Sequence, residues 1–375
     1  MSQPIGRETG GASGRQYNEP LAVWSRRLRM TWFDQTFAAG CRLRRQRTRA
    51  GRAIAVAALL STALFLPAHS LAAGPVEFGH AELQKVIEER GLNARSFHVA
   101  VEYSLVLAAD GFQIQGQIIR GGARRGLMYG LLEAADQLRE RKTLAAVKAT
   151  PRFEIRAARL HAGDEVLGRP EREWRGLFEA LARARFSRLR LEMRELTAER
   201  SLRLARIAPL AEEHAIDLAL SLEQIDPPLL LKLLGESIVF KAVEVPPGAA
   251  ATALATLSEA GRFVTLDIAA NAMTAELKSQ AQELRVPLLS LSKSEAGTAP
   301  YVWLTGLAAP ESLQTLAAGK AAGFEAGPLS ENWTGLEHQL GGWSSLAFNE
   351  ERGRAAAATG QPASKKKTAK KRPSQ

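Results

Sequence analysis

The sequence holds little of the chemistry that cysteine and histidine bring to active sites. Its one cysteine, Cys41, lies ahead of an expected signal-cleavage point, so the mature protein is expected to lack disulfides, thiolate metal sites and a thiol nucleophile. The 6 histidines are scattered without metal-ligand spacing. The motifs G-x-S-x-G and H-E-x-x-H and a phosphate-binding glycine loop are also absent. We therefore predict no metal and no cofactor.

The folded body also lacks the basic charge that the net charge of +11 suggests. Residues 1–52 carry a net charge of +8, and the tail 364–375 carries +6, which leaves −3 for the rest. A mildly acidic body argues against nucleic acid as its partner. We expect the tail 355–375 to be disordered, with lysines available either to an anionic membrane or cell-wall surface or simply to solvent.

The N-terminal region, residues 1–73, has the pattern of an export signal. The basic stretch 42–52 precedes an uncharged run that is apolar from Ala53 to Pro67 and ends in small residues. This order predicts secretion, with cleavage after Ala72 or Ala73 and a periplasmic or extracellular location. An uncleaved inner-membrane anchor is the alternative, and Met30 is a second possible start.

The next region, residues 76–150, is expected to be a small α+β domain. Residues 80–91 have a helical apolar pattern, residues 97–108 and 111–120 have strand patterns, and residues 121–139 form a second helix. The second helix carries Gly126 and Gly130, although glycine costs a helix about 1 kcal/mol relative to alanine. A phosphate cradle, a basic contact surface and close packing on the sheet are possible reasons. We favour close packing, with Arg124 and Arg125 at a solvent-facing helix entry.

From residue 154 to 354, strand patterns alternate with helical ones. The eight strand patterns lie at residues 155–163, 186–193, 216–224, 238–245, 262–270, 286–294, 301–308 and 324–327. Such alternation predicts parallel βαβ units in the α/β class, and eight strands fit a compact (β/α)8 TIM-like barrel. The alternative is an open doubly wound sheet. Residues 331–354 are expected to form the last helix and its exit.

Several of these segments resemble family-20 β-hexosaminidases and family-67 α-glucuronidases. Gly126, Tyr129 and Gly130 match their G-x-x-Y-G helix, and "PRFEIRA" (151–157) is similar to their entry into the barrel. The resemblance implies a hexosaminidase-like N-terminal domain beside a (β/α)8 barrel and a carbohydrate ligand. The family-20 acid pair after the fourth barrel strand is missing, because "IVFKAVEVPPG" (238–248) offers Glu244 alone.

Chemistry in a barrel is expected at the carboxyl ends of its strands, and glycoside hydrolysis needs two carboxyl groups there. Our candidate catalytic residues are Glu244, Glu192 and Asp267, although the last two could instead pair with arginines. The candidate substrate-binding residues are Arg156, His161, Trp303 and Trp333. The alternatives are a structural ion pair for Arg156, a satisfied loop histidine for His161, and packing for the two tryptophans. Other acids near strand ends are Asp164, Glu165, Glu195, Glu223, Asp226, Glu295 and Glu325.

Three functions fit these patterns. The first is an exported glycoside hydrolase-like protein that acts on or binds hexosaminide- or uronide-containing carbohydrate. The second is a non-catalytic carbohydrate-binding relative that has lost its acid pair, which the short loops favour. The third is an envelope-associated protein anchored by its lysine tail.

Overall fold

The computed structural model describes residues 74–93, 97, 99–291, 301–305, 323–329, 333, 340 and 347–352. The predicted export region and the lysine-rich tail lie outside these residues. Within the described part of the chain, no helix has the length and apolar character needed to cross a membrane. The described residues build two sheets, which we name the small sheet and the curled sheet.

The small sheet has five strands in the order β1-β3-β2-β4-β13. Its first four strands are β1 (Ala100–Tyr103), β2 (Phe112–Gln115), β3 (Ile118–Gly121) and β4 (Val147–Pro151). The single strand expected at 111–120 is instead a hairpin, because Gly116 adopts a left-handed φ of +61° and turns the chain between β2 and β3.

The fifth strand, β13 (Phe348–Arg352), pairs antiparallel with β4. The sequence pattern assigned this stretch to the exit of the last helix, so its return to the small sheet was not predicted. An edge strand that joins from almost 200 residues away has no local signal in the chain, because its pairing partner lies at Val147–Pro151.

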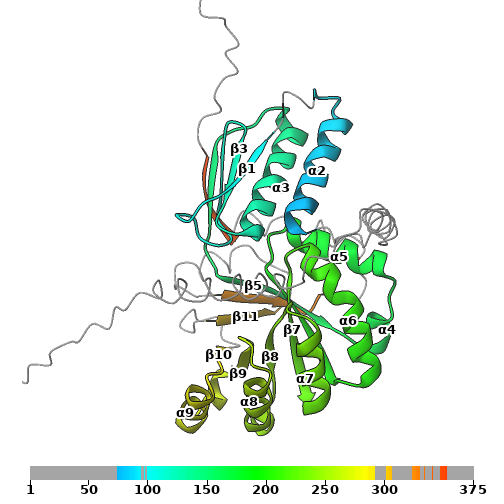
Figure 1. Cartoon of the computed structure of the whole chain (residues 1–375), viewed down its shortest axis with the longest axis vertical. Helices are drawn as coiled ribbons and strands as arrows, with labels where there is room; N and C mark the ends of the chain where they lie inside the picture. The colour runs from blue at the N-terminus through cyan, green and yellow to red at the C-terminus, as the bar shows by residue number, and fades with distance from the viewer. Residues whose placement is uncertain are drawn as a thin grey trace, which may run out of the picture. The chain divides into compact units, whose positions relative to one another are not determined.

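Two helices accompany the small sheet. Helix α3 (Arg124–Arg141) packs on the strands, and α2 (Pro75–Glu89) lies beside α3 (Figure 1). The close packing predicted for the glycines is confirmed. A Cβ on Gly126 would lie 2.4 Å from the Gly111 carbonyl oxygen, and one on Gly130 would lie 2.6 Å from Cγ2 of Ile119. Only glycine lets the helix approach the sheet this closely.

The curled sheet contains the eight strands expected from the alternating pattern. They are β5 (Ile155–His161), β6 (Arg188–Glu195), β7 (Asp217–Gln224), β8 (Phe240–Glu244), β9 (Thr265–Ala269), β10 (Leu288–Leu291), β11 (Tyr301–Thr305) and β12 (Gly323–Gly327). All pairings among them are parallel, in the order β10-β9-β8-β7-β6-β5-β12-β11. This mixed α/β arrangement is compatible with a TIM-like fold.

The two edges of the curled sheet, β10 and β11, approach within 8 Å between Cα atoms, without a hydrogen-bonded pairing among the described residues. Helices fill the connections from β5 to β10 as expected: α4 (Asp164–Leu167), α5 (Glu171–Arg183), α6 (Ala198–Glu213), α7 (Pro227–Glu236), α8 (Ala250–Glu259) and α9 (Ala275–Leu284). The helical pattern expected between β11 and β12 lies outside the described residues. The short 3-10 turns η3 (Pro247–Ala249) and η4 (Ala270–Ala272) precede α8 and α9. The main apolar core lies between these helices and the outer face of the sheet.

Candidate functional site

The inner face of the curled sheet carries charged side chains where such sheets usually carry branched aliphatic ones. Strand β6 shows the pattern most clearly. Leu189 and Leu191 are buried in the core shared with the helices, and Arg188, Arg190 and Glu192 alternate with them. Because side chains alternate across a strand, the three charged residues share the opposite, inner face.

Two arginines and two carboxylates form a network at the middle of this inner face. Glu325 accepts hydrogen bonds from Arg159 Nε at 2.5 Å and from Arg190 Nε at 2.7 Å. Arg190 also donates through Nη2 to Oδ2 of Asp267 at 2.5 Å. The side chains of Arg190, Asp267 and Glu325 are almost completely buried. A buried charge is tolerated only when it is paired in this way.

The network continues to the carboxyl ends of the strands, at a site that we name the mouth: Arg159, His161, Glu192 and Glu244. Arg159 contacts Oε2 of Glu244 through Nη2 at 2.7 Å and Oε1 of Glu192 through Nη1 at 3.6 Å. His161 Nδ1 lies 2.9 Å from Oε2 of Glu192. The side chains of His161, Glu192 and Glu244 are 54%, 35% and 22% exposed, so a ligand could reach all three.

The two buried acids of the network have opposite electrostatic behaviour. Burial acts to raise the pKa of Glu325, but the guanidinium groups of Arg190 and Arg159 outweigh it and hold the pKa below its usual value. Burial dominates at Asp267 and raises its pKa, with Arg190 and Arg188 offsetting only part of the effect. Among the described residues, Oδ1 of Asp267 has no hydrogen-bond partner.

The mouth holds two carboxylates, the number that a two-carboxylate glycoside hydrolase requires. Glu192 and Glu244 both contact the guanidinium of Arg159, at 3.6 Å and 2.7 Å. However, a general acid is held protonated by apolar surroundings or by a neighbouring negative charge. At the mouth, both carboxylates instead contact the guanidinium of Arg159, and Glu244 also lies 3.4 Å from Nη1 of Arg190. The described residues contain no group of three or more histidine, cysteine or acidic side chains that could hold a metal ion.

The structure thus brings together Glu192, Glu244, Asp267 and His161 of the predicted site residues, linked by Arg159 and Arg190. Arg156 lies elsewhere, near the amino end of β5, where it is fully buried and binds Asp110 at 2.6 Å and the carbonyl oxygens of Phe153 and Arg185 at 2.7 Å. These contacts match the structural alternative given for Arg156.

The two tryptophans that were predicted to contact the substrate, Trp333 and Trp303, say less about the site. Trp333 packs edge-on against Trp174, with 4.9 Å between ring centroids, and the Arg169 guanidinium lies 4.7 Å from its ring centre. Trp333 thus packs against Trp174 of α5, which matches the packing alternative. Trp303 belongs to β11, and its side chain lies outside the described residues, as does the whole of Glu295.

Sequence reasoning missed Arg159 and Arg190 and passed over Glu325 as one of several strand-end acids. A signal was present in the alternation of arginine with leucine in "RLRLE" (188–192). A parallel strand that is covered on both faces normally has a continuous apolar run. Charged residues at every second position of such a strand therefore indicate a charged interior.

Sequence comparisons identify no relatives: no family model matches the chain, and no curated protein matches it significantly. Similar solved structures include β-N-acetylhexosaminidase from Bacteroides fragilis (8% identity, TM-score 0.37, 52% of this chain and 64% of that one). Another is CpGH84D, whose name marks it as a glycoside hydrolase. It shares 9% identity at a TM-score of 0.43, over 71% of this chain and 57% of that one.

A structure of another stated activity is equally similar. N-acetylneuraminic acid synthetase from Leptospira borgpetersenii serovar Hardjo-bovis shares 12% identity at a TM-score of 0.38, over 54% of this chain and 84% of that one. The chain spans less than two thirds of the length of the hexosaminidase and of CpGH84D. Glycoside hydrolases are thus among the structural neighbours, but likenesses this distant assign no activity to this chain.

Proposed function

We propose that this protein is a carbohydrate-binding protein with a glycoside hydrolase-like architecture that does not hydrolyse its ligand. The observation that carries the proposal is the position of Arg159, whose guanidinium contacts both Glu192 and Glu244 at the mouth. This contact pairs both carboxylates with one cation, whereas two-carboxylate hydrolysis uses them on the substrate, one at each side of the scissile bond.

The polar groups of the mouth support a sugar as the ligand. The exposed edges of His161, Glu192 and Glu244 offer hydrogen-bond acceptors and an imidazole, which suit the hydroxyl groups of a saccharide. The sequence resemblance to family-20 and family-67 enzymes narrows the proposed ligand to hexosaminide- or uronide-containing carbohydrate.

The proposal is tested by measuring binding and hydrolysis on the same protein. Calorimetric titration with N-acetylhexosamine and glucuronate oligosaccharides is expected to show binding that weakens in Glu192→Gln and Glu244→Gln. Glu259→Gln, an exposed change at the end of α8, is the matched control and should bind as the wild type does. Aryl N-acetylhexosaminides and aryl glucuronides should not be cleaved above the buffer rate.

Hydrolysis that disappears in Glu244→Gln, Glu192→Gln or Asp267→Asn would overturn the non-catalytic proposal and favour a working two-carboxylate hydrolase. Binding that is equal in all the variants would remove the mouth as the sugar site.

We also propose that the protein is exported, on the basis of the basic and apolar segments within residues 1–73. Cell fractionation should find the protein outside the cytoplasm, and deletion of residues 42–73 should retain it inside. If removal of residues 364–375 releases it from membrane or cell-wall fractions, the tail is an anchor.

A further inference from the structure

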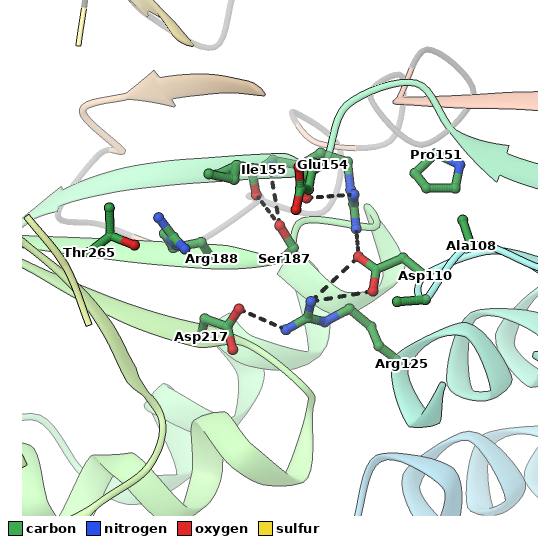
Figure 2. Close-up of a pocket in the computed structure, with 12 residues that line it drawn as sticks. Ala108, Asp110, Arg125, Pro151, Glu154, Ile155, Ser187, Arg188, Asp217 and Thr265 are labelled. Atoms are coloured by element: carbon green, nitrogen blue, oxygen red, sulfur yellow. Dashed lines mark hydrogen bonds and ion pairs between the residues drawn. The ribbon is translucent and has the colours of Figure 1, made fainter. Parts of the chain in front are cut away.

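Most charged side chains around the amino end of the curled sheet pair with one another. Figure 2 shows Arg125 between Asp110 and Asp217, at 3.4 Å and 3.1 Å. Arg156 binds Asp110 at 2.6 Å. Nε and Nη1 of Arg188 have no hydrogen-bond partner among the described residues, but both atoms are fully buried, so a ligand at this end would not reach them. Polar atoms that are both unpaired and accessible occur at the other end, beside the mouth.

Ser221 on β7 lies between the two carboxylates of the mouth. The strand register pairs it with Glu192 of β6 on one side and with Glu244 of β8 on the other. Its neighbours Leu220 and Leu222 belong to the core under the helices, so alternation along the strand turns the Ser221 side chain to the inner face. Because neighbouring strands lie about 4.8 Å apart, the backbones of Glu192 and Glu244 are about 9–10 Å apart, with Ser221 midway.

Two polar atoms at this point have no hydrogen-bond partner in the described part of the chain. One is the hydroxyl of Ser221, whose residue is half-buried and therefore still accessible. The other is Oε1 of Glu244. Glu244 accepts a hydrogen bond from Arg159 at 2.7 Å, and Arg190 approaches it to 3.4 Å, both at Oε2. Oε1 is left to a ligand.

Glu192 is more fully engaged by the protein. Its Oε1 lies 3.6 Å from Nη1 of Arg159, and its Oε2 lies 2.9 Å from Nδ1 of His161. Its carboxylate has less capacity for a ligand, even though Glu192 is more exposed than Glu244. Ser221 and Glu244 are therefore better placed to touch a ligand directly, while Glu192 holds Arg159 and His161 in position.

The chemistry of these two atoms fits two neighbouring hydroxyl groups of a sugar ring. A carboxylate oxygen only accepts, so the ligand must donate an O–H to Oε1 of Glu244. A serine hydroxyl both donates and accepts, so the next hydroxyl of the same ring can bind Ser221 in either direction. The carboxylate of a uronate and the carbonyl of an acetamido group cannot donate, and they are expected to lie away from Glu244.

We propose that Ser221 and Glu244 make the direct ligand contact of the mouth and bind two neighbouring hydroxyl groups of one sugar ring. This contact rests on the sugar binding proposed for the mouth. It adds Ser221 to the site and assigns the part of the sugar that the site recognises.

Calorimetric titration of the full chain with the N-acetylhexosamine and glucuronate oligosaccharides measures the contact. Ser221→Ala should weaken binding about two- to tenfold, the loss expected for one neutral hydrogen bond. Glu244→Gln should weaken it about tenfold or more, because hydrogen bonds to a charged acceptor are stronger, and Glu192→Gln should weaken it less. Ser279→Ala, an exposed change on α9, is the matched control and should bind as the wild type does.

Urea denaturation without ligand separates a ligand contact from a structural role. Ser221→Ala should unfold at the same urea concentration as the wild type, because the hydroxyl that it removes makes no hydrogen bond within the described part of the chain. Weaker binding at unchanged stability is the expected combination. A loss of stability that accounts for the loss of binding would contradict the contact.

Chemical labelling tests access to Ser221 without depending on a sugar. In the Cys41→Ser background, Ser221→Cys carries the single thiol of the chain. A methanethiosulfonate reagent should modify this thiol, and a saturating oligosaccharide should slow the modification. Ser279→Cys should be modified at a rate that the oligosaccharide does not change, and Ser201→Cys, at a buried position of α6, should stay unmodified.

The outcomes distinguish this contact from the proposed function. Sugar binding that Ser221→Ala leaves unchanged would overturn the contact and leave the mouth as a sugar site. A thiol in Ser221→Cys that the reagent does not reach would also overturn it, as would a larger loss in Glu192→Gln than in Glu244→Gln. If the wild type binds none of the oligosaccharides, the proposed function fails and the contact fails with it.

Discussion

The packing of helix α3 on the small sheet and the inner face of the curled sheet are stabilised by different means. At the small sheet, helix α3 comes close because Gly126 and Gly130 have no side chains to hold it away. At the curled sheet, the interior is filled by long charged side chains whose guanidinium and carboxylate groups pair with one another. The first interface depends on shape and the second on charge balance, so they should respond differently to substitution.

The largest expected effect comes from unbalancing the charged interior. Glu325→Gln removes the carboxylate that Arg159 and Arg190 share and leaves buried positive charge uncompensated. We expect the free energy of unfolding to fall by about 3–5 kcal/mol, measured by urea denaturation. Glu223→Gln, an exposed change on β7, should alter it by less than about 0.5 kcal/mol. Equal stability of the two variants would show that the network is not balanced as described.

A substitution where α3 packs on the small sheet should lower the free energy of unfolding by less. Gly126→Ala places a Cβ 2.4 Å from a backbone carbonyl oxygen that cannot move aside easily, and we expect a loss of about 1–3 kcal/mol. Gly176→Ala in α5 is the matched control, because a Cβ there meets nothing within 4 Å. That variant should gain up to about 1 kcal/mol from helix propensity. A loss in both variants, or in neither, would contradict close packing at α3.

At the amino end of strand β6, removal of the charge of Arg188 should stabilise the protein. Arg188→Met replaces a buried guanidinium that has no partner among the described residues with an apolar side chain of similar length. We expect a gain of about 1 kcal/mol or more in the free energy of unfolding without ligand. A loss comparable to that of Glu325→Gln would mean that Arg188 belongs to the paired network.

The smallest expected effect is a change in the free energy of unfolding with pH. Because burial raises the pKa of Asp267, its contribution to stability is present below pH 3.8, the usual pKa, and is lost as the pH rises through the higher folded value. Asp267→Asn does not titrate, so its stability relative to the wild type should be greater at pH 7 than at pH 3. Urea denaturation at both values measures the difference, and the opposite trend would contradict the raised pKa.

The comparison of the two sheets also explains how much the sequence could predict. The glycine interface follows from a local pattern, because Gly126 and Gly130 lie beside an apolar stripe in one helix. The eight strands likewise follow from local alternation. The network could not be found locally, since Glu325 meets Arg159 and Arg190 across 166 and 135 positions of the chain. Arg125 was wrongly placed in solvent for the same reason, because its partners include Asp217 on β7.

The pairing of strand β13 with β4 could not be predicted either, because the two strands lie almost 200 residues apart in the chain. The prediction of the site residues agreed better with the structure, because carboxylates at the carboxyl ends of parallel strands must gather at one edge of the sheet. Glu192 and Glu244 do so, and the guanidinium of Arg159 links them. What local patterns could not supply was the cation between the acids, which decides the chemistry proposed for the mouth.

The central claim, that Arg159 binds the carboxylates of the mouth, is tested most directly by a double-mutant cycle on Arg159→Met and Glu244→Gln. The two groups are 2.7 Å apart, so their substitutions should not be additive. We predict a coupling free energy of about 1–3 kcal/mol from urea denaturation of the two single variants and the double variant. Additive effects, with a coupling free energy near zero, would contradict the account.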